Sequence, residues 1–305
     1  MTKVKLSIII LSWNTAKLLR QCLESLMNEL IVNELINSEV IVVDNGSTDE
    51  SVREVKNLKL EFENQLKLKN CKLQVIENKT NLGFSKGNNV GIKAAAGEYV
   101  MLLNSDTIVK EGALKNLVNF LDENPNVDIV GPKLLNADGS VQANCGRFPS
   151  LPVCLVMLFK EHFGGSDFVR CSPPKTQEVD WLMGAAFVAR KKVFEKIGGL
   201  DEKIFMYMEE VEWFYRAKLA GFKACFYNGA EIIHLGRGSS SSGKKEPILN
   251  IYRGLIYFYQ KHKNPFELMI LKIMLKIKAV MALFWGFLKN DLYLKETYAE
   301  AIRIN

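Results

Sequence analysis

The sequence lacks the features that mark several large classes of protein. Its 6 cysteines are scattered singly, without the close pairs of a zinc site, so reduced thiols in a cytosolic protein are the simplest interpretation. No glycine-rich phosphate loop follows the first strand-like segment, where Ser12-Trp13-Asn14-Thr15 stands instead. A dinucleotide-dependent dehydrogenase needs a Gly-x-Gly-x-x-Gly motif at that point, so the sequence argues against one.

The chain also has little excess charge. Its 40 lysines and arginines against 34 acidic residues leave a formal charge of +6, which is too small to predict a nucleic acid as partner. With 305 residues, 48% of them hydrophobic, the chain can form one large domain, with or without an appendage. The apolar segment 6–11 is too short for the core of a signal peptide, so we expect the catalytic part in the cytoplasm.

Short β-branched segments alternate with helical patterns over the first half of the chain. We expect strands at 6–11, 40–43, 73–76 and 99–103, and helices at 16–36, 50–69, 86–96 and 113–121. This order predicts an α/β fold with a mostly parallel central sheet flanked by helices. Ligands of such sheets bind beyond the carboxyl ends of the strands.

The pattern changes after Pro149. Residues 151–174 carry Gly, Pro and Ser signals and are expected to be irregular. We expect an extended segment at 179–190, helices at 191–197 and 209–220, and short strands at 224–227 and 231–234. The composition then becomes apolar with interspersed lysines, which predicts a helical C-terminal appendage over residues 244–305.

Polar side chains follow the expected strands. Asp106 comes directly after one of them, behind Asn104, and offers the oxygen ligands that Mg²⁺ or Mn²⁺ prefers; alternatively it caps the next helix. Asp44 can accept hydrogen bonds from a base or a ribose. The loop from Asn81, with Gly83 and Lys86, either brings backbone and charge to a phosphate or is a plain helix start.

Two further motifs lie in the second half of the chain. Glu209 and Glu210 lie at the start of an expected helix. A carboxylate there can serve as general base for a hydroxyl, or it can simply interact favourably with the positive end of the helix dipole. His234 ends a strand before a basic Gly/Ser loop at 236–245. A lone histidine is usually structural, but a loop of this kind can also close over a phosphate as a lid.

The order of these motifs resembles the family 2 inverting glycosyltransferases, and within them the rhamnosyltransferase-like branch. The segments that carry the resemblance, over residues 4–243, are LSIIILSWN, IVVDNGSTDES, NLGFSKGNN, YVMLLNSDT, WLMGAAFVARKKVFEKIGGLDEKIFMYMEEVEWFYRAKLAG and IIHLGRGSS. The resemblance implies a GT-A fold, a nucleotide-sugar donor and a single-displacement inversion. It also implies a Rossmann-like nucleotide-sugar half over about residues 1–110 and an acceptor half over about 111–243.

The resemblance assigns a role to each matching residue. Donor contacts are implied for Trp13, Asp44, Asn81, Gly83, Lys86, Asn104 and Asp106; metal ligation for Asp106 and His234; the base position for Glu210 with its neighbour Glu209; and acceptor contacts for Trp181 and Gly184. Two positions depart from the family pattern. Asn104 replaces the first Asp of the Asp-x-Asp motif, and a Glu-Glu pair replaces Glu-Asp, which leaves open which glutamate is the base.

The apolar segment Pro265–Leu288 allows two interpretations. Its longest uninterrupted apolar run, Ala279–Leu288, is about half of what a membrane-spanning helix needs. Lys272 and Lys276 lie one turn apart, as in a basic amphipathic helix that lies in the inner leaflet with Phe284, Trp285 and Phe287 as anchors. The alternative is a helix that packs in the core or between subunits.

The sequence therefore predicts an inverting glycosyltransferase that depends on Mg²⁺ or Mn²⁺. It would transfer sugar from dTDP-rhamnose or a UDP-sugar to a hydroxyl of a carbohydrate or lipid-linked glycan in cell-surface polysaccharide synthesis. We expect it in the cytoplasm, or peripheral on the inner face of the membrane. A sugar nucleotidyltransferase and a non-catalytic nucleotide-sugar-binding subunit are the alternatives.

Overall fold

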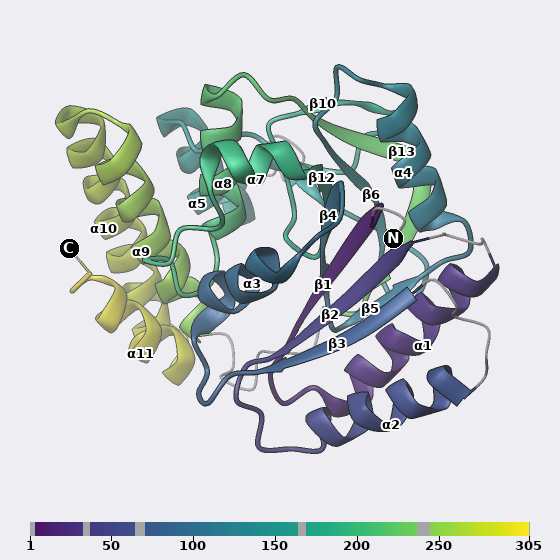
Figure 1. The fold of residues 1–305 in the computed structure, drawn as a ribbon. Coiled ribbons are helices and arrows are strands. Elements are labelled where there is room, and N and C mark those ends of the chain that lie inside the picture. The colour runs from purple at the N-terminus through teal and green to yellow at the C-terminus, as the bar shows by residue number, and fades with distance from the viewer. Residues whose placement is uncertain (1–3, 33–36, 65–70, 164–168, 237–244, 305) are drawn as a thin grey trace.

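A computed structural model describes residues 4–32, 37–64, 71–163, 169–236 and 245–304 (Figure 1). Within these residues a central sheet runs in the order β10-β13-β6-β12-β4-β1-β2-β3, with β5 added beside β13 and β7 beside β6. The predicted α/β fold with a mostly parallel sheet is confirmed. The basic loop expected to act as a lid, with Arg237 and Lys244, lies outside the described residues.

The first half of the sheet is parallel. Its strands are β1 (Leu6–Ser12), β2 (Ser38–Asp44), β3 (Cys71–Glu77) and β4 (Tyr99–Asn104). Side chains of a strand alternate between its faces, so Ile8 and Ile10 enter one hydrophobic cluster while Ile9 enters another. A strand that is buried on both faces needs a continuous apolar run, which explains the sequence of β1.

Helices cover both faces of this sheet. The first cluster lies under α1 (Ala16–Val32), α2 (Ser51–Asn64) and α4 (Ala113–Glu123). The second lies under α3 (Gly83–Ala94), α7 (Lys191–Ile197) and α8 (Glu209–Leu219). Figure 1 shows α1 and α2 on one side of the sheet and α3 on the other.

The second half of the sheet is mixed. Antiparallel β12 (Ala186–Arg190) separates β4 from β6 (Ile129–Leu135), which pairs in parallel with β13 (Ala224–His234). The sequence gives no clear signal for β6, because its Gly131-Pro132 pair is typical of a turn. The missing amide of Pro132 is accommodated at a register shift in β13, between Tyr227 and Glu231, so the two short strands expected there are one bulged strand.

The expectation of an irregular segment at 151–174 is wrong in its first part. Leu151–Phe163 forms helix α5. Pro152 lies in its first turn, where the missing amide hydrogen costs no helical hydrogen bond. The proline that suggested a loop is therefore compatible with a helix start.

The C-terminal helices pack against the rest of the chain through a third hydrophobic cluster. They are α9 (Lys245–His262), α10 (Pro265–Leu288) and α11 (Leu292–Ala301), and they form a layer at the edge of the molecule (Figure 1). The cluster also contains Cys154 and Leu158 of α5. Gly254 of α9 lies so close to Met208 that an added Cβ would stand 2.8 Å from the Met208 side chain. The helices thus reach the turn that precedes α8. The predicted boundary at residue 243 stays a prediction.

Candidate functional site

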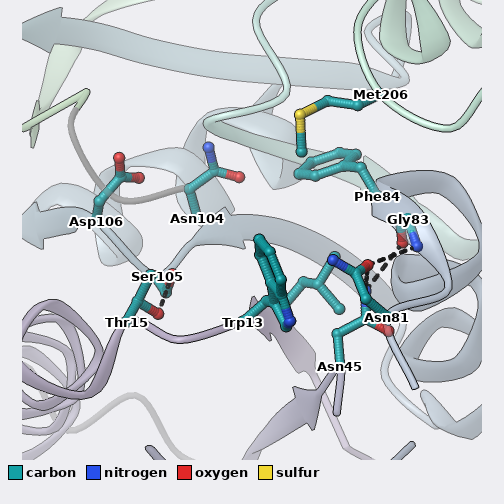
Figure 2. Close-up of a pocket in the computed structure, with 11 residues that line it drawn as sticks. Trp13, Thr15, Asn45, Asn81, Gly83, Phe84, Asn104, Ser105, Asp106 and Met206 are labelled. Atoms are coloured by element: carbon teal, nitrogen blue, oxygen red, sulfur yellow. Dashed lines mark hydrogen bonds between the residues drawn. The ribbon is translucent and has the colours of Figure 1, made fainter. Parts of the chain in front are cut away.

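Two neighbouring cavities lie at the carboxyl ends of the parallel strands. The first is lined by Leu11, Trp13, Thr15, Asn45, Asn81, Gly83, Phe84, Asn104, Ser105, Asp106 and Met206 (Figure 2). The second is lined by Phe84, Asn104, Asp106, Arg170, Trp181, Met183, Gly184, Ala185, Met206, Tyr207, Glu209, Glu210, His234 and Gly236. Since both lists contain Asn104 and Asp106, these two side chains stand where the cavities meet.

Asn45 organises one wall of the first cavity. Its Nδ2 donates to Asn81 Oδ1 at 2.9 Å and to the Gly83 carbonyl at 3.2 Å, while its Oδ1 accepts from the Leu82 amide at 3.1 Å. The Gly83 backbone has φ +82, and a Cβ there would stand 2.5 Å from the Phe205 ring. Only glycine fits this position, so the loop after β3 is fixed in shape before any ligand binds.

The opposite wall of the first cavity carries Asp106 and Asn104. The hydroxyl groups of Thr15 and Ser105, 3.1 Å apart, lie on the same side of the cavity as Asp106. Figure 2 shows the Trp13 ring standing between the Asn104–Asp106 side and the Asn45–Asn81 side. An aromatic face flanked by amides is a suitable surface for a planar base.

Two residues expected to contact the donor do not line either cavity. Asp44 is buried, and its Oδ2 accepts from the amides of Gly46 at 3.1 Å and Ser47 at 3.0 Å. Its Oδ1 is buried without a hydrogen-bond partner among the described residues. Lys86 is exposed on α3. Asn45, which was not among the expected donor contacts, lines the first cavity.

Strand pairing holds Asp106 and His234 together. Strand β5 (Thr107–Val109) pairs with the end of β13 so that Thr107 faces His234, and the Leu235 amide donates to the Asp106 carbonyl at 2.9 Å. The imidazole Nε2 lies 3.4 Å from Asp106 Oδ1. Both side chains are mostly buried, so neither can move far from the other.

The donor atoms of this pair fit a divalent cation. The described residues hold no group of three or more His, Cys, Asp or Glu side chains that could bind a metal alone. A carboxylate oxygen and an imidazole nitrogen can nevertheless supply two ligands, and two diphosphate oxygens of a bound nucleotide could supply further ones. Such a site would be complete only when the nucleotide is present.

Glu209 and Glu210 follow a strained turn. Tyr207 and Met208 both have positive φ, at 67° and 74°, and α8 starts directly after them. Non-glycine residues in this region cost free energy and are held there only by their surroundings. The turn delivers both carboxyl groups to the second cavity, where Gly184 lies between Phe84 and Glu210.

The two glutamates differ in their surroundings. Burial, together with the charge of Glu210, raises the pKa of Glu209 well above its ordinary value. Burial also raises the pKa of Glu210, but backbone amide donors, among them Gly184, and the charge of Arg170 act against this rise. The amide donors and the Arg170 charge therefore favour Glu210 as the ionised member of the pair.

Arg170 is a site residue that the sequence analysis missed. It comes from β9 (Arg170–Cys171), lines the second cavity, and lies over the Trp181 ring at 5.8 Å. Its Nη2 donates to the Ala143 carbonyl at 3.0 Å, while Nε is buried without a partner among the described residues. No local sequence pattern marks it, because only the fold brings it beside Glu210.

The third glutamate of this segment, Glu212, has a structural role. Its side chain is fully buried and contacts Arg216 at 2.9 Å, Lys261 at 2.8 Å and His262 at 3.0 Å. We expect Glu212→Ala to destabilise the fold by about 3–5 kcal/mol, because it removes the fully buried carboxylate that pairs with the mostly buried Arg216 guanidinium. Urea unfolding measures this, with the exposed Glu195→Ala on α7 as control. A loss no larger than that of the control would contradict the role.

The profile described as "Glycosyl transferase family 2" matches residues 7–198. The chain belongs to this family. The predicted family and enzyme class are therefore confirmed. The matched region contains β1 to β4, the Asn104–Asp106 motif, and Trp181 and Gly184, for which acceptor contacts are expected.

Relatives of this family 2 chain are identical to it at about a quarter of the aligned positions. It is 28% identical over 196 residues to the low-salt glycan biosynthesis hexosyltransferase Agl10 of Haloferax volcanii, covering 59% of this chain and 53% of that one. It is 27% identical over 221 residues to the N-acetylglucosaminyl-diphospho-decaprenol L-rhamnosyltransferase of Mycobacterium tuberculosis, covering 64% of this chain and 66% of that one. The chain thus matches between half and two thirds of each relative's length.

Solved structures share the fold. TarS 1–349 of S. aureus, in complex with UDP-GlcNAc, matches 98% of this chain and 79% of its own with a TM-score of 0.57 at 19% identity. GalNAc-T7, with UDP, GalNAc and Mn²⁺, matches 85% of this chain and 50% of its own with a TM-score of 0.59 at 17% identity. The predicted GT-A fold is confirmed by this likeness.

Proposed function

We propose that this protein transfers a sugar from a nucleotide diphosphate donor to a hydroxyl group of a glycan acceptor, with inversion at the anomeric carbon. The observation that carries the proposal is that Asp106, His234 and Glu210 line the second cavity, which adjoins the first cavity, lined by Trp13, Asn45 and Asn81. The nucleobase, the diphosphate and the attacking acceptor hydroxyl of the reaction would then lie one after another along the two cavities.

In this proposal the first cavity binds the donor. The Trp13 ring and the amides of Asn45 and Asn81 would hold the nucleoside, and Asp106 with His234 would hold Mg²⁺ or Mn²⁺. The cation would supply positive charge that stabilises the leaving diphosphate. The Mn²⁺ bound to GalNAc-T7, a protein of the same fold, supports this choice of ion.

The second cavity binds the acceptor. An acceptor hydroxyl between Trp181 and Gly184 loses its proton to Glu210 while its oxygen bonds to the anomeric carbon. The bond from that carbon to the diphosphate oxygen breaks in the same step, and the nucleoside diphosphate leaves with the electron pair. Attack from the side opposite the leaving group inverts the configuration.

The donor and acceptor classes are drawn from the relatives. The M. tuberculosis relative is named for transfer of L-rhamnose to a lipid-linked N-acetylglucosamine, and TarS has been solved in complex with UDP-GlcNAc. We therefore propose a dTDP-sugar such as dTDP-rhamnose, or a UDP-sugar, as donor and a lipid-linked glycan of cell-surface polysaccharide synthesis as acceptor. A place of action in the cytoplasm, at the inner face of the membrane, belongs to the same proposal.

A panel of UDP- and dTDP-sugars tests the function. We expect the matching donor to raise the melting temperature in the presence of Mn²⁺, and to release nucleoside diphosphate slowly when water replaces the acceptor. A sugar nucleotidyltransferase would release pyrophosphate from a nucleoside triphosphate instead, and a non-catalytic subunit would bind the donor without cleaving it. The proposal is wrong if no nucleotide of the panel stabilises the protein.

Helix α10 supports membrane contact. None of the described helices is long and apolar enough to cross a membrane. One face of α10 packs inward through Leu271, Leu275, Ala279 and Ala282, while the opposite face exposes a continuous apolar stripe of Phe266, Met269, Ile273, Ile277, Val280, Phe284 and Leu288. Lys272 and Lys276 lie along one edge of this stripe. An apolar face with a basic edge is the pattern of a helix that lies in an anionic membrane surface.

Vesicle binding tests this contact. We expect the protein to sediment with vesicles that contain phosphatidylglycerol and Phe284→Glu to weaken the binding by about tenfold or more, since it removes a large buried side chain from the lipid. The matched control is Leu60→Glu on α2, because Leu60 is 59% exposed and Phe284 60%. Equal loss in both variants, or no binding of the unmodified protein, would refute membrane contact.

A further inference from the structure

A chain of hydrogen bonds lies behind His234, on the side away from Asp106. His234 Nδ1 is 2.8 Å from Gln142 Oε1, and Gln142 Nε2 donates to Asn136 Oδ1 at 2.8 Å. Asn136 Nδ2 donates to Ser140 Oγ at 2.9 Å, and Ser140 Oγ donates to Asp138 Oδ1 at 2.6 Å. The chain ends at a carboxylate on the surface.

This end fixes the direction of every bond in the chain. The Ser140 hydroxyl lowers the pKa of Asp138, which is therefore ionised at neutral pH and can only accept. Ser140 must then accept from the amide nitrogen of Asn136, whose oxygen accepts from the amide nitrogen of Gln142. The remaining atom of Gln142 is its oxygen, which can only accept, so His234 donates from Nδ1–H.

The opposite orientation would break this order. If the Gln142 amide were reversed, its nitrogen would face Nδ1 and its oxygen would face Asn136 Oδ1, so Asn136 would have to reverse as well. Ser140 would then give up its bond to Asp138. The reversed state would also place an N–H on Nε2 at 3.4 Å from Asp106, beyond the length of a good hydrogen bond.

The fold holds the chain in place. Asn136 to Ser140 form the turn between β6 and β7 (Val141–Gln142), closed by the Asn136 amide on the Ser140 carbonyl at 2.8 Å. Gln142 pairs with Leu134 across this hairpin. Because β6 also pairs with β13, the hairpin that carries Gln142 and the strand that ends in His234 belong to one sheet.

We propose that Gln142 is a positioning residue that holds His234 in the Nδ1–H tautomer and so presents the Nε2 lone pair to a divalent cation at Asp106. A nitrogen that carries a proton cannot bind a metal ion, and a hydrogen bond to the other ring nitrogen sets which one is bare. The inference rests on the proposed function only for the presence of the cation. The tautomer itself is a property of the protein without metal.

The tautomer can be observed directly in the metal-free protein. The chain has only 3 histidines, so ¹⁵N-histidine labelling gives a simple NMR spectrum, and His234→Gln identifies the signals of His234. At pH 8, above the ordinary imidazole pKa of about 6.5, we expect the Nδ1–H form in the unmodified protein and a mixture of both forms in Gln142→Met. An Nε2–H form in the unmodified protein would overturn the inference.

Metal affinity tests the consequence. With UDP present, the electron paramagnetic resonance signal of unbound Mn²⁺ should show about tenfold weaker binding or more in Gln142→Met, as for other residues behind a metal ligand. Gln177→Met, at an exposed position of β10 (Gln177–Val179), is the matched control and should bind as the unmodified protein does. If Gln142→Met does not fold, Asn136→Ala frees the Gln142 amide and should weaken binding in the same direction.

The outcomes separate this inference from the proposed function. If the unmodified protein binds no Mn²⁺ with UDP, the metal site fails and with it the role given to Gln142. If the unmodified protein binds Mn²⁺ and the Gln142 or Asn136 variants bind it equally well, only the inference fails. Weaker binding confined to these variants supports both.

Discussion

Glu210→Gln should lower kcat/KM for sugar transfer by about a hundredfold to ten-thousandfold, the usual contribution of a general base. Glutamine keeps the size of the side chain but cannot take the proton of the acceptor hydroxyl. Binding of the nucleotide should change little, since Glu210 lines the second cavity and not the first. Initial rates with the natural acceptor, alongside a nucleotide titration, measure both quantities.

Glu209→Gln is the informative control for this prediction. Burial and the charge of Glu210 raise the pKa of Glu209, which favours the protonated form of its carboxyl group, and that form resembles a neutral amide. We therefore expect Glu209→Gln to retain activity within a few-fold. The assignment of the base is reversed if Glu209→Gln is the more damaging of the two.

The pH dependence of transfer follows from the same environment. A general base works only when it is deprotonated, and burial raises the pKa of Glu210 above that of an exposed carboxyl group. Activity should therefore fall as the pH drops through this raised pKa, at a less acidic pH than the ordinary glutamate value of about 4.3. The acid limb of the kcat/KM profile should be absent from whatever activity remains in Glu210→Gln.

The sequence was most informative where local pattern and position in the sheet agree. Apolar runs such as Leu6–Leu11 are typical of strands buried on both faces. Because ligands bind beyond the carboxyl ends of such strands, Asp106 could be predicted as a site residue. His234 lies far from Asp106 in the sequence. The structure brings the two together by pairing β5 with β13, and neither segment carries a local sequence signal for this pairing.

The residues that sequence reasoning missed depend on such long-range contacts. Arg170 reaches the second cavity only because β9 pairs with β8 (Cys145–Gly146), which in turn pairs with β11 (Trp181–Leu182). Gln142 contacts His234 only because of the hairpin that follows β6. The sequence of β6 itself contains a Gly-Pro pair, which is typical of a turn. A single sequence carries no signal for partners that are set by sheet order.

Asp106→Asn should reduce binding of Mn²⁺ in the presence of nucleotide, and sugar transfer, by at least about a hundredfold. The variant keeps the size of this mostly buried side chain while removing its charge, and a cation at a leaving diphosphate contributes several kcal/mol to the transition state. Nucleotide binding measured without metal should be nearly unchanged, since Trp13 and Asn45 remain.

Asp128→Asn provides the matched control for this last prediction. Asp128 is also buried, at 7% exposure against 8% for Asp106, but it precedes β6 and so lies at the amino-terminal edge of the sheet, opposite the cavities. Its carboxylate binds Lys192 at 2.7 Å and the Lys223 amide at 3.1 Å, so its loss should affect stability and leave the metal requirement intact. Full activity and unchanged Mn²⁺ affinity in Asp106→Asn would mean that the diphosphate is stabilised by other groups, and the proposed metal site would have to be abandoned.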